Sequence, residues 1–83
     1  MNQYKDIENS IIEIVAQITN NIKVDANTTQ IDCPGWDSLG FLVIISEVES
    51  QFSINVGVDI FDQMNSVKNI SNFVYSEILK KGI

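Results

Sequence analysis

The sequence has no histidine and only one cysteine, and both shortages narrow the chemistry open to the chain. Histidine is the side chain that most often acts as a general base or a metal ligand near neutral pH. The single cysteine, Cys33, cannot form a disulfide within the chain, and no basic residue close to it in the sequence would activate its thiol. We therefore expect no catalytic residue, no metal site and an unreactive Cys33, so any catalysis would use groups of other proteins.

Basic residues are also scarce: the chain has 5 lysines and arginines against 11 aspartates and glutamates, a formal net charge of −6. Nucleic-acid binding depends on phosphate contacts from lysine and arginine, so this balance argues against a nucleic-acid partner. It argues equally against an anionic membrane surface. An acidic surface instead suits docking onto basic patches of other proteins, because electrostatic attraction between opposite charges speeds association.

Long hydrophobic runs are missing as well. No apolar segment approaches the ~20 residues that span a bilayer, and Met1 is followed by polar residues and not by the basic and then apolar run of a signal peptide. We expect a cytoplasmic protein without membrane insertion. The length of 83 residues is enough for one domain, which we assign to residues 1–83.

The apolar residues that are present recur at spacings of three and four, which is typical of amphipathic helices. The pattern predicts helices over residues 3–18 and 38–52, a short helix over 58–64, and a last helix from a cap at Asn65 or Ser66 to about residue 80, with Gly82 as its stop. Residues 22–34 form a long loop packed across the helices. The predicted fold class is all-α, a small four-helix bundle with a short third helix. The acids of the first helix (Asp6, Glu8 and Glu13) lie off its apolar stripe, so we expect them to face solvent.

The second predicted helix has two apolar faces. One carries the core stripe of Phe41, Ile44, Ile45, Val48 and Phe52. At ~100° per residue, Leu39, Leu42 and Val43 fall on roughly the opposite side. Either the first turns of this helix are buried all round, or the second face meets a partner.

The loop that leads into this helix ends in the segment Gly35-Trp36-Asp37-Ser38-Leu39-Gly40, and the helix begins within this segment. Asp37 and Ser38 are both favoured N-cap residues, because a short side-chain oxygen can accept a bond from a free N–H of the first turn. Ser38 therefore places a hydroxyl at the positive end of a helix, where an attached anion is favoured. Trp36 is predicted to anchor the loop on the core.

The Asp37-Ser38-Leu39 tripeptide, followed by an apolar helix with Glu49 and Phe52, resembles the acyl carrier protein family, and the order of helices along nearly the whole chain is similar too. The resemblance implies that Ser38 carries a 4′-phosphopantetheine arm, transferred from coenzyme A by a separate Mg²⁺-dependent phosphopantetheinyl transferase. It implies that Asp37 supports this modification as well as capping the helix. The arm's thiol would hold an acyl group as a thioester for acyl-loading and acyl-transfer enzymes. Partner enzymes would touch Leu39, Leu42, Val43 and Glu49, and we expect a monomer.

The sequence departs from the fatty-acid carriers of that family at two positions. Those carriers commonly have an acidic residue where Val43 stands and a polar or acidic one in place of Gly40. The form of the segment looks more like stand-alone carriers of polyketide, nonribosomal peptide or surface-polysaccharide pathways, with a fatty-acid pathway still open. A peptidyl or aminoacyl carrier, including a D-alanyl carrier, is an alternative. Another is an unmodified acidic adaptor that binds proteins through Leu39–Val43, with Ser38 serving only as a helix cap.

Overall fold

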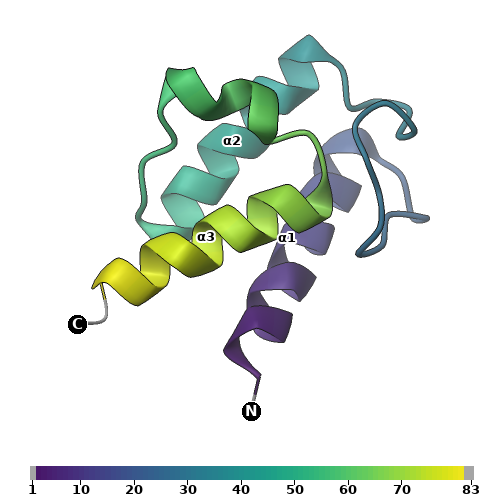
Figure 1. Ribbon diagram of the computed structural model, residues 1–83. Helices are drawn as coiled ribbons and strands as arrows, with labels where there is room; N and C mark the ends of the chain where they lie inside the picture. The colour runs from purple at the N-terminus through teal and green to yellow at the C-terminus, as the bar shows by residue number, and fades with distance from the viewer. Residues whose placement is uncertain (1, 82–83) are drawn as a thin grey trace.

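Four helical segments follow one another along residues 2–81, the part of the chain that the computed structural model describes (Figure 1). They are α1 (Gln3–Thr19), α2 (Ser38–Phe52), the short η1 (Val58–Gln63) and α3 (Val67–Lys81). The predicted all-α class and the order of elements are confirmed. The predicted stop at Gly82 lies outside the described residues. No helix within residues 2–81 is long and apolar enough to cross a bilayer.

Helix α1 is the central support of the bundle, because it packs against both α2 and α3. Its N-terminus is capped by Asn2, whose side chain accepts a hydrogen bond from the Lys5 N–H at 3.1 Å. It ends at Asn20, which adopts the left-handed conformation with φ of 55°. The core between the helices is mainly aliphatic. Its fully enclosed side chains are Ile11, Val15, Ile44, Val48, Val67, Ile70 and Val74, together with the polar Ser71.

The prediction that the acids of α1 face solvent is wrong for Glu8, which is only 3% exposed. Lys5, one turn earlier, places its Nζ 3.1 Å from Glu8 Oε1, so the buried carboxylate has a cationic partner. Tyr4 lies beside this pair and meets Tyr75 of α3 edge to face, with ring centroids 5.5 Å apart. Burial raises the pKa of Tyr4, and the negative charge of Glu8 adds to the effect.

The third helical segment is a 3₁₀-helix and ends at Gln63, one residue before the predicted end. It is attached to α2 through Phe61, whose ring meets Phe41 edge to face at a centroid distance of 5.3 Å. Helix α3 is capped by Ser66, whose Oγ accepts the Asn69 N–H at 3.0 Å. Of the two caps predicted for this helix, Ser66 is therefore the one used.

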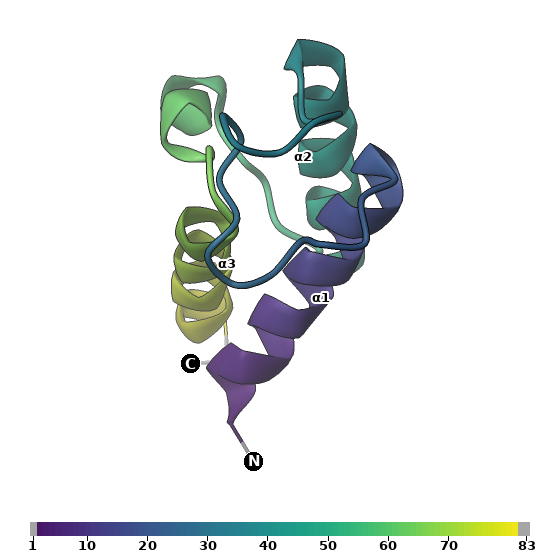
Figure 2. The same ribbon diagram turned by 90° about the vertical axis from the view of Figure 1, so that its right-hand side faces the viewer.

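The long loop between α1 and α2 consists of successive turns, and backbone hydrogen bonds join it to the start of α3. It passes from the end of α1 across to the start of α3 and back to α2 (Figure 2). The Gln30 N–H donates to Asn65 O at 2.8 Å, and the Val67 N–H donates to Thr28 O at 3.0 Å. Val24, Cys33 and Trp36 of this loop are buried in the core, so the prediction of a loop packed across the helices is confirmed. These contacts hold the segment that precedes Ser38.

Candidate functional site

Ser38 is the first residue of α2, and Asp37 is the residue that caps the helix. Asp37 has an extended backbone, and its Oδ1 accepts the Gly40 N–H at 2.7 Å. Because Asp37 satisfies the cap, the hydroxyl of Ser38 is not needed for it. Both side chains are exposed. The structure thus separates two roles that the sequence left open, and it leaves Ser38 with a free primary hydroxyl at the helix start.

Two glycines bring the loop into close contact with the ends of α1 and α2. Gly35 has φ of +92°, and a Cβ there would lie 2.7 Å from the carbonyl oxygen of Thr19 at the end of α1. A Cβ on Gly40 would lie 2.7 Å from the carbonyl oxygen of Gly35. A side chain at either position would push the backbones apart. This close contact explains why residue 40 is a glycine in this fold, although fatty-acid carriers commonly have a polar or acidic residue there.

The first turn of α2 also offers hydrogen-bond donors to a group attached at Ser38. The N–H groups of Gly40 and Phe41 in this turn donate to Asp37. Within residues 2–81, the N–H groups of Ser38 and Leu39 donate to no acceptor. Free N–H groups at a positive helix end favour a phosphate. A phosphodiester on the Ser38 hydroxyl therefore fits its surroundings.

A groove of about 340 Å³ opens beside Ser38, and we call it the serine groove. Its walls come from three segments: α2, the long loop and η1. They are formed by Gln30, Ser38, Phe41, Leu42, Phe61 and Asp62. The sequence pattern did not mark Gln30, Phe61 or Asp62 as residues of the site. No local pattern could have found them, because the tertiary fold alone brings these segments to Ser38.

The three residues of the second apolar face are exposed, and we call them the α2 patch: Leu39, Leu42 and Val43. Their exposed fractions are 74%, 52% and 48%. Of the two sequence readings, burial of the first turns all round is wrong. Leu42 and Val43 also line a groove of about 350 Å³, whose opposite wall includes Ile14 and Ile18 of α1. The chain therefore presents an apolar surface directly beside Ser38.

Glu49 makes a contact within the chain that the sequence did not reveal. Its Oε2 accepts a hydrogen bond from the Val56 N–H at 2.8 Å, and the residue is half-buried. It lies eleven residues after Ser38, about 16 Å along a helix that rises ~1.5 Å per residue. Its observed role is to hold the segment that follows α2. A contact between Glu49 and a partner stays a prediction.

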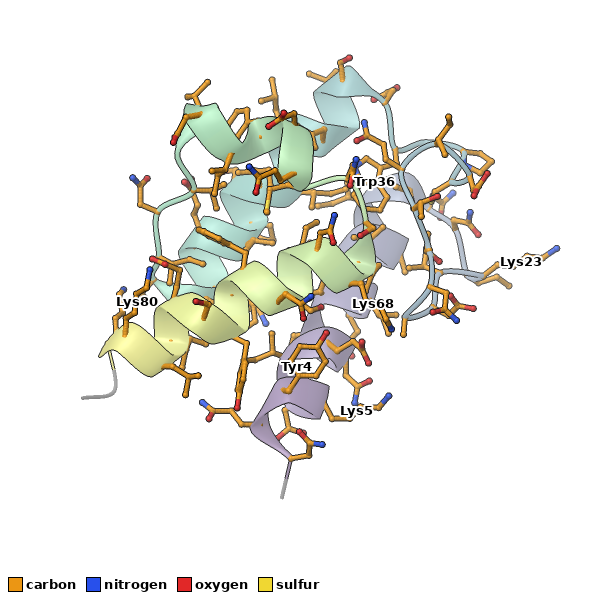
Figure 3. The ribbon with its side chains drawn as sticks, in the orientation of Figure 1. Tyr4, Lys5, Lys23, Trp36, Lys68 and Lys80 are labelled. Carbon is orange, nitrogen blue, oxygen red and sulfur yellow. The ribbon has the colours of Figure 1, made fainter. Side chains whose placement is uncertain are left out.

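Trp36 and Cys33 are two buried residues of the long loop. Trp36 is 3% exposed, in line with its predicted anchoring role, and Figure 3 shows it among the loop and helix ends. Cys33 packs at 3.8 Å from Thr19 Oγ1 and is 4% exposed. Within residues 2–81 no three metal-ligating side chains come together.

Comparison with known proteins identifies the family of the chain. Residues 9–74 match the family described as "Phosphopantetheine attachment site". The chain is 33% identical over 60 residues to a D-alanyl carrier protein of Latilactobacillus sakei subsp. sakei (strain 23K), which covers 70% of this chain and 77% of that protein. The family's prosthetic group is covalently attached 4′-phosphopantetheine, and its members are generally carriers and not catalysts. The chain belongs to the family of phosphopantetheine-dependent carrier proteins.

Proposed function

We propose that Ser38 is the attachment residue and that the chain carries its cargo on a 4′-phosphopantetheine arm linked there. In the modification, a bond forms between Ser38 Oγ and the phosphorus that bears the pantetheine of coenzyme A. The phosphoanhydride bond breaks, adenosine 3′,5′-bisphosphate leaves, and the hydroxyl proton passes to a base of the transferase. The arm, once attached, supplies a thiol that holds the cargo as a thioester.

The observation that carries this proposal is the free, exposed hydroxyl of Ser38 at a helix start that a different residue caps. A primary hydroxyl without a β-branch is accessible to a transferase. The open N–H groups of Ser38 and Leu39 favour the phosphodiester product. The carboxylate of Asp37 places a negative charge beside the Ser38 hydroxyl, where it can help a transferase position Mg²⁺ or coenzyme A.

The α2 patch is our proposed docking surface for the transferase and for the enzymes that load and unload the arm. Transient interfaces combine a small apolar centre with a charged rim. Here the centre is Leu39, Leu42 and Val43, and Glu47 lies at the edge of the groove that adjoins it. We further propose that the chain acts as a cytoplasmic monomer in a specialised pathway, because Val43 stands where fatty-acid carriers commonly have an acid.

A D-alanyl or other aminoacyl cargo is the second candidate, and the similarity to a D-alanyl carrier protein supports it. The two candidates differ in the enzyme that loads the thiol. The phosphopantetheinylated protein is incubated with ATP and either a D-alanine–carrier ligase or a panel of acyl-loading enzymes. A mass gain of one alanyl group supports the aminoacyl carrier. A gain only with acyl-loading enzymes supports the acyl carrier.

The attachment itself is tested by intact mass after incubation with coenzyme A, Mg²⁺ and a permissive phosphopantetheinyl transferase. We expect a gain of one phosphopantetheine on the native chain and none on Ser38→Ala. Ser46→Ala is the matched control, because Ser46 is exposed on the same helix and should leave the gain unchanged. No gain on a folded native chain with several transferases would instead favour the unmodified adaptor.

A further inference from the structure

Two aromatic side chains of the serine groove stand between Ser38 and the core. Phe41 of α2 and Phe61 of η1 both line the groove, and both are half-buried and packed against the buried core residues. Their rings meet edge to face at a centroid distance of 5.3 Å. A cargo that moved from Ser38 into the core through the serine groove would therefore have to part these two rings.

The core side chains next to this ring pair are enclosed on all sides. Ile44 follows Phe41 by one turn on the same face of α2 and has no accessible surface. Val48 and Val67 have none either. No space that would admit a water molecule touches such a side chain. A hydrocarbon chain is wider than a water molecule, so it could enter here only by displacing these side chains.

The composition of the core opposes such a displacement. Sixteen apolar residues are buried within residues 2–81, and seven of them are isoleucines and six are valines. A β-branched side chain is restricted at χ1, so it changes conformation less readily than leucine or methionine. Met64 is the only one of the sixteen with a long unbranched side chain. The core is therefore stiff, and a long cargo would have to deform it.

The remaining walls of the serine groove are partly polar. Gln30 and Asp62 line it, and Asp62 is exposed. An apolar chain that lay against the Asp62 carboxylate would displace water bound to a charged group, which is unfavourable. A short or polar group displaces less of this water. The walls of the groove therefore do not favour a long hydrocarbon chain.

We infer that the ring pair of Phe41 and Phe61 keeps the cargo out of the core, and that the cargo class is a short or polar acyl group, aminoacyl groups included. This inference rests on the proposed attachment at Ser38. The cargo stays in solvent at the end of the arm, where a partner enzyme reaches it without opening the bundle. A long fatty acyl chain does not fit, because it would remain exposed to water.

The inference is tested with cargoes of increasing length, which a permissive transferase installs together with the arm when it is given an acyl-coenzyme A. The chain is modified with acetyl-, butyryl- or octanoyl-coenzyme A, and each product is confirmed by intact mass. We expect the same denaturation midpoint for all three products. Retention on a hydrophobic-interaction column should increase from acetyl to octanoyl, because the longer chain adds apolar surface in contact with water.

The location of the octanoyl chain is measured by nuclear Overhauser contacts with methyl groups of the core. We expect no contact with the methyl groups of Ile44 or Val67. Such contacts, or a denaturation midpoint that rises with the length of the cargo, overturn the inference but leave the proposed function standing. Absence of any mass gain on a folded chain, with coenzyme A itself as well, overturns both.

Variants of the ring pair test its role directly. Phe61→Ala should admit the octanoyl chain, so contacts with the methyl groups of Ile44 should appear. Phe61→Leu, a milder change that also removes the ring, should give the same contacts in weaker form. Phe73→Ala is the control, because Phe73 is a half-buried ring on α3 that packs against the core outside the serine groove. Folded Phe61 variants without these contacts would contradict the role of the ring pair.

Discussion

At the scale of single residues, the site depends on a division of tasks between neighbours. Asp37 caps α2 through a 2.7 Å bond to the Gly40 N–H, which leaves Ser38 free to be modified. Gly35 and Gly40 allow the backbone contacts that hold this short segment between α1 and α2. The sequence alone could not assign the cap, because Asp37 and Ser38 are equally suitable N-cap residues.

The two proposed tasks of Asp37 can be separated by two substitutions. Asp37→Ala removes the cap and should lower the free energy of unfolding by about 1 kcal/mol. Asp37→Asn keeps an accepting oxygen and should retain most of that stability. If the negative charge also supports modification, both variants should be modified more slowly than the native chain. Denaturant unfolding and timed intact mass check these outcomes, and a native rate for Asp37→Asn would confine Asp37 to capping.

Gly40 should be intolerant of even one methyl group. Gly40→Ala places a Cβ 2.7 Å from the Gly35 carbonyl oxygen, and overpacking of this kind costs about 1–3 kcal/mol, partly offset by the better helix propensity of alanine. We expect a net loss of about 1 kcal/mol and slower modification of the displaced Ser38.

Gly57→Ala is the matched control for Gly40→Ala. Its Cβ would meet only the Asp59 carboxylate, a side chain that can rotate away. Chemical denaturation of both variants should show a loss for Gly40→Ala alone. Equal stability of the two variants would show that the contact between Gly35 and the first turn of α2 is not restrictive.

At the scale of secondary-structure elements, α2 has one apolar face buried in the core and a second apolar face exposed, which is the proposed docking surface. Ile44, Ile45 and Val48 are buried against α1, whereas Leu39, Leu42 and Val43 remain exposed. The sequence predicted both faces from their helical spacing. It could not decide whether the second face was covered, because that depends on where the long loop runs.

Shortening a side chain of the α2 patch should lower the activity of partner enzymes toward the chain and should leave its stability unchanged. Leu42→Ala should lower the transferase's kcat/KM about fivefold to tenfold, as expected when an interface contact worth about 1 kcal/mol or slightly more is lost. Its free energy of unfolding should change little, since the side chain is 52% exposed. Leu79→Ala on α3, exposed to 48%, is the control and should leave kcat/KM unchanged. Equal effects of the two variants would remove the α2 patch from the docking surface.

Glu49 should contribute to stability through the segment after α2. Glu49→Ala removes the acceptor of the Val56 N–H, and a hydrogen bond to a charged group contributes about 1.5–3 kcal/mol at most. We expect a loss near the lower end of this range, because the residue is only half-buried. Glu47→Ala, exposed on the same helix, serves as the comparison in thermal and denaturant unfolding. A native stability for Glu49→Ala would refute the structural role assigned to this contact.

At the scale of the whole molecule, charge is distributed very unevenly along the chain. Residues 24–67 include none of the 5 basic residues but carry these acids: Asp25, Asp32, Asp37, Glu47, Glu49, Asp59 and Asp62. The labelled lysines in Figure 3 come from α1, from the beginning of the long loop and from α3. The segments that surround Ser38 are therefore acidic, which complements a basic partner surface.

This distribution predicts a salt-dependent encounter with the transferase. Raising the ionic strength from about 0.01 M to 0.15 M shortens the Debye length from ~30 Å to ~8 Å, so kcat/KM should fall about tenfold or more. Asp59→Asn combined with Asp62→Asn should weaken the salt dependence, whereas Asp6→Asn, outside residues 24–67, should not. A rate that is independent of salt would argue that charge does not steer this encounter.

Sequence reasoning recovered the helices, because periodic apolar residues record which face each helix buries. The exposure predicted for Glu8 was wrong, since a buried carboxylate paired with Lys5 leaves no mark in the apolar pattern. Sequence reasoning could not place Gln30, Phe61 and Asp62 beside Ser38, because these residues come from segments joined only by the tertiary fold. The helices were therefore predictable, whereas the choice of cap at the start of α2 and the grooves around Ser38 were not.

The central claim, that Ser38 carries the arm, is tested most directly on the unmutated protein. Cleavage after lysine yields one fragment, residues 24–68, which contains Ser38 together with Ser46 and three further serines. Tandem mass spectrometry of this fragment after modification locates the added group. The account predicts that the fragment ions place a single phosphopantetheine on Ser38. Placement on another serine, or an unmodified fragment from a folded chain exposed to several transferases, would contradict it.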